Sequence, residues 1–273
     1  MIVRVHGLVI RALPYRESDA LVTLLTREAG KIGLIAPGAR KVRSRLAAHT
    51  QLLRLGTYIL YRGRSLYRLD QADTTALLKT RLHDPLVNQR TMEMLEWVLR
   101  LTEDEVSDPF LYDHVERSFL RLDQGEPLDV TWLIFQLVML SHMGYGPSWD
   151  RCTRCGLSDD LKAFVPQEGG MICGTCLKHH PPLHNVTLLP PRLVWVLQQI
   201  VRTPPHLLGS VRLKPENVEL VLKPLAQFVF LHVPVRFRTQ EVWRGADELT
   251  RLAEDLKRAR RAPGTGEDEG DVS

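Results

Sequence analysis

Cysteine is scarce in this chain of 273 residues, which has four cysteines, all between positions 152 and 176. Apolar residues make up 44% of the chain and charged residues 25%, which is enough material for an ordinary folded core without covalent cross-links. Thiols stay reduced inside cells, and two CxxC pairs in a reducing compartment are more typical of a metal site than of disulfides.

Long apolar runs are also missing. The longest mainly apolar stretch, residues 130–140, is much shorter than the roughly 20 residues that a membrane-spanning helix needs. Residues 1–20 alternate between apolar and polar types, whereas a signal peptide has a basic segment followed by an unbroken apolar one. We therefore expect a cytoplasmic protein that has no membrane partner.

The common catalytic motifs are absent as well. The sequence contains no GxxxxGK[ST] loop, no GxSxG and no HExxH, and the neighbours Asp70 and Asp73 have no third carboxylate close to them. The H-x-E of His114 to Glu116 matches half of a zinc deaminase signature, but Arg151 stands before the first cysteine where that signature has proline. We interpret it as a chance match and expect a binding protein rather than an enzyme.

Positive charge is concentrated at one end of the chain. Residues 1–80 hold 14 Lys and Arg against 5 Asp and Glu, whereas the remaining 193 residues hold 22 against 27. A local excess of this kind is typical of a protein with a polyanionic partner, although a solvated basic surface without a partner has the same composition.

The sequence pattern of the basic region predicts short strands. Five segments alternate between apolar and polar residues or lie between turn residues: 2–5, 20–26, 31–37, 56–62 and 65–72. Leu8 and Ile10 resume the apolar face of the first strand in the opposite register, so we expect a bulge at Gly7. Five such strands in about 80 residues predict a small closed barrel of the OB-fold type.

Most of the excess charge falls on turns of the predicted barrel. A basic loop lies between the third and fourth strands and ends in a short helical turn, and a hairpin tip follows. The candidate nucleic-acid-binding residues are Lys31, Arg40, Lys41, Arg43, Arg45, Arg62 and Arg64. Seven phosphate contacts would lower log K by roughly 5 to 6 per decade of salt. Tyr58, Tyr61 and Tyr67 are candidate platforms for base stacking, although a tyrosine on a strand is more often a packing residue.

From residue 83 onward the apolar period changes from two to 3.6, which predicts helices. The expected helices cover residues 84–105, 108–125, 129–146, 189–202 and 214–233. Asp108 is a candidate N-cap, and residues 129–146 are apolar on most faces, as in a buried central helix. Residues 257–273 contain few apolar side chains and are expected to be disordered.

The four cysteines form the pattern C-x2-C-x17-C-x2-C: Cys152, Cys155, Cys173 and Cys176. Two thiolates on each of two tight turns can supply opposite edges of a tetrahedron, which is the arrangement of a structural zinc site. Four thiolates leave no open position for water, which disfavours a catalytic zinc, and no thioredoxin-like pattern supports a redox pair. His179, His180 and His184 could replace a ligand, but four cysteines already suffice.

Several segments together resemble a family. The residues Gly7, Tyr15, Glu17, Asp19, Thr26 and Gly30, followed by the GARK loop at Gly38 to Lys41 and by Ser44, resemble the N-terminal region of the bacterial recombination mediator RecO. The stretch "LSHMGYGPSWDRCTRCG" and the half-finger "FVPQEGGMICGTC" resemble later segments of the same family. The resemblance is good over residues 1–185, and beyond them it extends only to the hydrophobic pattern.

The resemblance implies an α+β multidomain protein in which an OB-fold barrel precedes a helical domain with an inserted four-cysteine zinc finger. The expected boundaries are 1–80 for the barrel, 81–147 and 187–256 for the helical domain, 148–186 for the finger and 257–273 for the tail. The single structural Zn²⁺ would be held by the four thiolates. Such proteins act without ATP and associate with the nucleoid.

The resemblance also implies the partners. They are single- and double-stranded DNA, the protein RecR, and the acidic, apolar C-terminal tail of single-stranded DNA-binding protein (SSB). Members of the family anneal complementary strands and help RecR to load recombinase onto SSB-coated DNA. A zinc-dependent enzyme that modifies nucleic acids and an RNA-binding OB protein remain alternatives.

Overall fold

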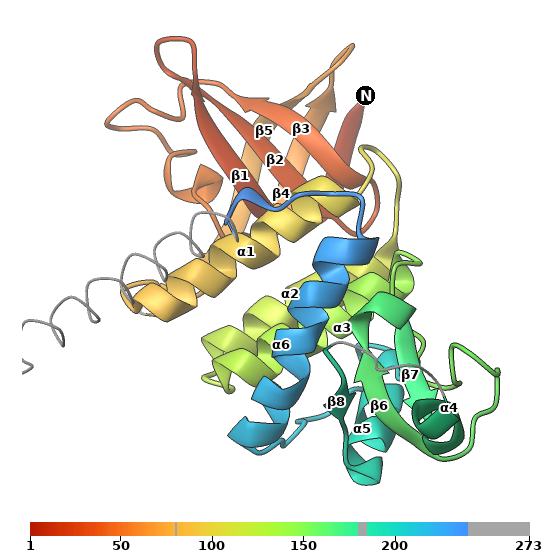
Figure 1. Ribbon diagram of the computed structural model, residues 1–273. Coiled ribbons are helices and arrows are strands. Elements are labelled where there is room, and N and C mark those ends of the chain that lie inside the picture. Colours follow the sequence, from red (N-terminus) through yellow and green to blue (C-terminus); the bar gives the residue numbers. More distant parts are fainter. Residues whose placement is uncertain (80, 180–184, 240–273) are drawn as a thin grey trace, which may run out of the picture. The chain divides into compact units, whose positions relative to one another are not determined.

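The computed structural model describes residues 1–79, 81–179 and 185–239. Its first part is a closed five-stranded barrel with the strand order β1-β2-β3-β5-β4, in which β1 also pairs with β4 (Figure 1). The strands are β1 (Ile2–Tyr15), β2 (Asp19–Thr26), β3 (Gly30–Ala36), β4 (Arg54–Arg62) and β5 (Tyr67–Ala76). This order, with a parallel contact between β3 and β5, confirms the predicted OB-fold barrel.

The barrel closes because β1 serves two neighbours. Its first half pairs with β4 from Ile2 to Leu8, and its second half pairs with β2 from Gly7 to Tyr15. The predicted bulge at Gly7 is in the wrong place, since the strand continues through this residue and the register shifts between Val9 and Arg11. A Cβ at Gly7 would lie 3.0 Å from the carbonyl oxygen of Leu25, so glycine permits close strand contact here.

The helices follow their predicted limits closely. They are α1 (Pro85–Leu101), α2 (Pro109–Asp123), α3 (Leu128–His142), α5 (Pro191–Arg202) and α6 (Pro215–His232). Asp108 caps α2, as predicted, because its carboxylate accepts a hydrogen bond from the backbone N–H of Leu111 at 2.9 Å. Every residue from Val130 to Leu140 is buried, which confirms α3 as the central helix.

The cysteine segment forms a small three-stranded sheet with the order β7-β6-β8. Its elements are β6 (Leu161–Val165), the 3-10 turn η2 (Pro166–Glu168), β7 (Gly170–Cys173), the short helix α4 (Gly174–His179) and β8 (Thr187–Leu188). Another 3-10 turn, η1 (Ala48–Thr50), lies between β3 and β4. Phe164 of β6 is fully buried between Trp149 and Phe228 of α6, at ring-centroid distances of 4.8 and 6.2 Å. The sheet is therefore packed into the helical core.

Contacts group Met1–Arg236 into one compact unit. The finer division into barrel, helical domain and finger stays a prediction, and the expected tail at 257–273 lies outside the described residues. Among the residues that the structure describes, no helix has both the length and the apolar character needed to cross a bilayer.

Candidate metal centre and nucleic-acid surface

The four cysteines converge on one point. The Sγ atoms of Cys152, Cys155, Cys173 and Cys176 all lie within 4.8 Å of one another. The Sγ atoms of Cys155 and Cys173 are 3.7 Å apart. Zinc–thiolate bonds of about 2.3 Å at a tetrahedral angle would separate two sulfurs by roughly 3.8 Å, so the sulfur set fits a tetrahedral, thiophilic cation.

Two tight turns bring the sulfurs together. The first turn reverses at Gly156, whose φ of 78° lies in the left-handed region, and is closed by a hydrogen bond from its N–H to the carbonyl oxygen of Cys152 at 2.9 Å. The second turn joins β7 to α4, and the N–H of Cys176 points at the sulfur of Cys173 at 3.4 Å. Such N–H donors favour thiolates over thiols.

The thiol pKa values diverge within the cluster. Burial raises the pKa of Cys152, but backbone N–H donors, first among them that of Cys155, outweigh this effect and lower it to about 6. Burial and the neighbouring thiols raise the pKa of Cys176 to about 12. Four thiolates in this space would repel one another, so full deprotonation calls for a cation at the centre.

Histidine does not join this cluster among the described residues. His179 is exposed at the end of α4, and the group of metal-ligating side chains consists of the four cysteines. His180 and His184 lie outside the described residues. His114 of the H-x-E sequence is buried in α2, where its Nε2 contacts the carbonyl oxygen of Phe135 at 3.1 Å. The deaminase arrangement is therefore not formed.

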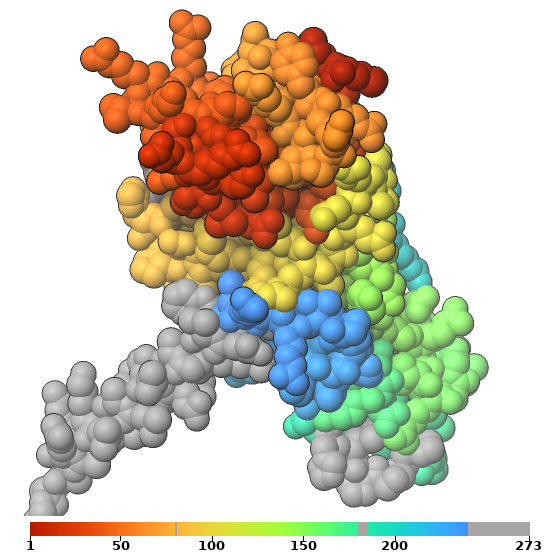
Figure 2. Space-filling model, turned by 90° about the horizontal axis from the view of Figure 1, so that it is seen from above, coloured from red at the N-terminus to blue at the C-terminus, as the bar shows by residue number. Residues whose placement is uncertain are grey.

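The predicted basic loop is exposed and well anchored. The side chains of Arg40, Lys41, Arg43 and Arg45 are all exposed between β3 and η1. The loop is held at its base, because the carboxylate of Asp19 accepts a hydrogen bond from the N–H of Gly38 at 2.8 Å. Figure 2 shows the side chains of this orange segment extending from the barrel into solvent. The hydrogen bond to Asp19 thus fixes the start of the loop, while its cations are exposed to solvent.

The β1–β2 turn adds a cation that the sequence analysis missed. The guanidinium of Arg40 donates to the carbonyl oxygens of Arg16 and Glu17, each at 3.3 Å, so the turn and the basic loop lie side by side. Arg16 itself is exposed, and its Cζ lies 5.2 Å from the ring centre of Tyr15. The Tyr-x-Glu-x-Asp pattern marked this turn, but a lone arginine within it carried no separate signal.

The hairpin between β4 and β5 carries Arg62 and Arg64, both exposed as predicted. The three candidate tyrosines differ in their exposure to solvent. Tyr58 is fully buried, its hydroxyl donates to the carbonyl oxygen of Arg54 at 3.0 Å, and burial raises its pKa. Tyr67 is half-buried against the barrel core, and Tyr61 is 42% exposed. Of the three, Tyr61 alone has the exposure that base stacking requires.

Lys31 is buried, unlike the other predicted cations. It is 8% exposed, and its Nζ donates to the carbonyl oxygens of Leu99 at 2.9 Å and Thr102 at 2.7 Å. The carboxylate of Asp104 lies 3.2 Å from the same nitrogen. Lys31 therefore neutralises the C-terminal end of α1 and links the barrel to the helices, and we leave it out of the nucleic-acid surface.

The comparisons with known families cover both halves of the chain. The family model described as "Recombination protein O N terminal" matches residues 1–78, and "Recombination protein O C terminal" matches residues 92–241. These matches contain the barrel with its basic loop and the helices with the cysteine sheet.

Curated relatives agree with these matches. The chain is similar to a DNA repair protein RecO of Bacillus velezensis, with 33% identity over 80% of this chain and 84% of the relative. It is also similar to RecO proteins of Bacillus pumilus, with 30% identity over 84% of this chain and 88% of the relative, and of Listeria innocua, with 29% identity over 89% and 94%.

Proposed function

Because this chain belongs to the RecO family of DNA repair proteins, we propose that it is an ATP-independent recombination mediator that binds DNA without chemically altering it. The observation that carries the proposal is the anchored basic loop at the end of an OB-fold barrel. In this role the protein binds single and double strands and anneals complementary ones. With RecR, it helps to load recombinase onto SSB-coated DNA.

The DNA surface consists of exposed cations on three connections of the barrel: the β1–β2 turn, the basic loop that it contacts, and the β4–β5 hairpin. We call this set the basic rim: Arg16, Arg40, Lys41, Arg43, Arg45, Arg62 and Arg64. Phosphate contacts of this kind attract any sequence, because they do not reach the edges of the bases. We therefore expect low sequence specificity and strong salt dependence. For a single strand, each phosphate contact should lower log K by about 0.7 for every tenfold rise in salt concentration.

Annealing follows from the same charges. Two complementary strands repel each other through their phosphates, and a surface that neutralises both backbones lowers this repulsion while the bases stay free to pair. The anchored base of the loop reduces the conformational entropy lost when a strand binds. No ATP is needed for such a step, since the pairing of bases supplies the driving force.

For the cysteine cluster we propose one structural Zn²⁺ held by Cys152, Cys155, Cys173 and Cys176. The converging sulfurs support this assignment. The ion would supply folding energy to a sheet of short strands, and four sulfur ligands would leave no position at which water could be activated.

The remaining partners rest on family membership. RecR and the acidic, apolar tail of SSB belong to the mediator role, and so does a location at the nucleoid in the cytoplasm. The SSB tail requires an apolar pocket with basic side chains around its opening. A cavity at Glu216, Glu219, Leu220 and Lys223 of α6, about 250 Å³ in volume, carries more acidic than basic groups and does not fit that ligand.

The test is the annealing rate of complementary strands coated with SSB, measured without ATP at several salt concentrations. We expect acceleration that fades as salt rises. Reversing two charges, in Arg43→Glu with Arg45→Glu, should flatten the slope of log K against log salt by between about 1 and 2 and slow annealing. Reversing Arg117 of α2 and Arg192 of α5, both exposed, makes the same change in net charge and is the matched control.

Equal effects of the two charge reversals would remove the basic rim from the mechanism. Tighter binding of structured RNA than of single-stranded DNA would favour the RNA-binding alternative. Cobalt substitution addresses the enzyme alternative, because an absorption spectrum without four-sulfur character would contradict a closed structural site.

A further inference from the structure

The usual ligand face of the barrel is partly covered in this protein. OB-folds bind oligonucleotides on the outer face of strands 2 and 3, between the β1–β2 and β4–β5 loops. Here Thr23 and Leu25 of β2 point to that face, yet they are only 7% and 2% exposed. The C-terminal end of α1 and the connector after it lie there, and the N–H of Glu105 bonds to the carbonyl oxygen of Lys31 at 2.9 Å.

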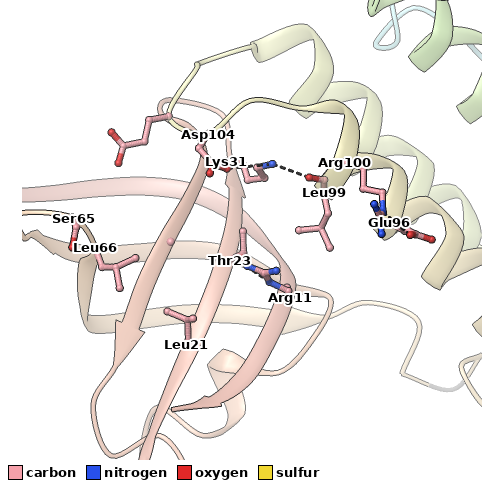
Figure 3. Close-up of a pocket in the computed structure, with 12 residues that line it drawn as sticks. Arg11, Leu21, Thr23, Lys31, Ser65, Leu66, Glu96, Leu99, Arg100 and Asp104 are labelled. Atoms are coloured by element: carbon pink, nitrogen blue, oxygen red, sulfur yellow. Dashed lines mark hydrogen bonds and ion pairs between the residues drawn. The ribbon is translucent and has the colours of Figure 1, made fainter. Parts of the chain in front are cut away.

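A cavity of about 610 Å³ remains where this cover ends. Figure 3 shows that Arg11, Leu21 and Thr23 of the strands form its floor. Ser65 and Leu66 of the β4–β5 hairpin line one side, and α1 lines the other. We call this cavity the α1 groove. Its volume lies within the range of about 300 to 1,000 Å³ that is typical of small-molecule sites, so it has room for nucleobases but not for a duplex.

The charges of the α1 groove differ from those of the basic rim. Its lining holds three cations and three carboxylates, the latter from Glu96, Asp104 and Glu105. Two of the cations already have partners, since Lys31 contacts Asp104 at 3.2 Å and Arg100 contacts Glu96 at 2.6 Å. A site without net positive charge does not attract phosphates, and its carboxylates would repel them.

The same lining suits unpaired bases. Leu21, Leu66 and Leu99 present apolar surface on which the face of a base can pack. The guanidinium of Arg11, whose Nε donates to the hydroxyl of Thr23 at 3.3 Å, has further N–H groups for base acceptors. Carboxylates can accept hydrogen bonds from the amino groups of bases. These are the interactions that a single strand offers and a duplex keeps inside its stack.

We infer that the α1 groove holds a few unpaired bases of a single strand whose phosphates lie on the basic rim. This inference rests on the proposed DNA binding and adds the orientation of the strand, with its bases toward α1 and its backbone toward solvent. The helical domain then contributes directly to strand binding through α1. The groove gives preference for single strands over duplex, whereas the rim gives the salt dependence.

The two contributions can be separated by filling the groove. Leu21→Trp adds bulk to its floor, and Leu13→Trp is the matched control, because Leu13 pairs with Leu21 but does not line the groove. The measurements are the dissociation constants for a single strand, for the duplex and for an abasic strand of equal length, each at several salt concentrations. Unfolding curves show whether each variant folds.

We expect Leu21→Trp to bind the single strand at least roughly fivefold more weakly, with unchanged binding of the duplex and the abasic strand and an unchanged salt slope. The control should match the unaltered protein. If Leu21→Trp fails to fold, Ser65→Trp at the exposed hairpin decides the same question.

A groove-filling variant that binds all three DNAs like its control overturns the base-binding inference and leaves the basic rim intact. If reversing Arg43 and Arg45 also has no effect on DNA binding, the proposed function fails as well. Unaltered protein that binds abasic and normal strands equally would likewise contradict the inference.

Discussion

The carboxylate of Asp19, at the start of β2, accepts a hydrogen bond at 2.8 Å from the backbone N–H of Gly38, at the start of the basic loop. These residues belong to the Tyr-x-Glu-x-Asp and GARK segments, and the contact joins the two segments in space. One anchors the other, so a loop rich in arginine keeps a defined base despite the mutual repulsion of its charges.

Replacing this anchor should weaken DNA binding without changing the charge of the rim itself. In Asp19→Ala the Gly38 N–H loses its acceptor, at a cost of about 1 kcal/mol, and the loop becomes less ordered. We expect a two- to fivefold loss of affinity for single strands, on the order of that energy. Asp19→Asn keeps an acceptor oxygen and serves as the control, since it also removes the negative charge. Equal gains in affinity for both variants would show that charge, rather than anchoring, matters at this position.

Lys31 should affect stability rather than DNA binding. In Lys31→Met the carbonyl oxygens of Leu99 and Thr102 lose a charged donor, so the free energy of unfolding should fall by about 1 to 3 kcal/mol. The salt slope of DNA binding should stay the same, in contrast to Arg43→Met on the rim. Denaturant unfolding and binding titrations check the two halves of this prediction. A flatter salt slope for Lys31→Met would return the residue to the DNA surface.

Removal of the proposed Zn²⁺ should loosen the helices that pack on the cysteine sheet. His232 of α6 contacts the carbonyl oxygen of Pro166 in η2 at 2.7 Å, and Phe228 packs on Phe164. We expect a chelator or Cys173→Ser to lower Tm by about 5 °C or more and to change the fluorescence of buried Trp149. Thr175→Ser, beside the cluster, is the control. The salt slope of DNA binding should persist, because the rim lies on the barrel.

Acid should destabilise the helical core through His114. Burial lowers the pKa of this residue to about 4, despite the carbonyl of Phe135, and Arg121 and His142 add to the lowering. The unfolded chain, with a histidine pKa of about 6.5, therefore binds a proton that the folded chain excludes. Stability is complete above about pH 6.5 and falls as the pH decreases toward 4, by at most about 3 kcal/mol.

His114→Gln, which keeps an N–H donor for Phe135, should lose this part of the pH dependence. The measurement is the free energy of unfolding between pH 7 and 4 for both proteins. Parallel curves would show that His114 does not titrate as its burial requires.

Much of the fold and of the cysteine cluster follows from local pattern. The five strands, the five longer helices and the cap at Asp108 agree with the sequence because hydrophobic period and capping chemistry act over a few residues. The four cysteines could be recognised for the same reason, since the spacing of the two CxxC pairs alone indicates two tight turns whose thiols can converge. The exposed cations of the basic loop and hairpin were likewise visible as turns rich in arginine.

Tertiary structure decided what each remaining side chain faces. Lys31 was predicted to bind DNA, but α1 covers it. Tyr58 was a candidate for either base stacking or packing, and the barrel core encloses it. Arg16 joins the rim only because Arg40 bonds across to its turn. The α1 groove exists because a helix distant in sequence stops partway across the strands. The sequence alone thus determined the elements and the cluster of four cysteines, whereas burial and neighbouring charge depend on which elements meet, and that is settled only by packing.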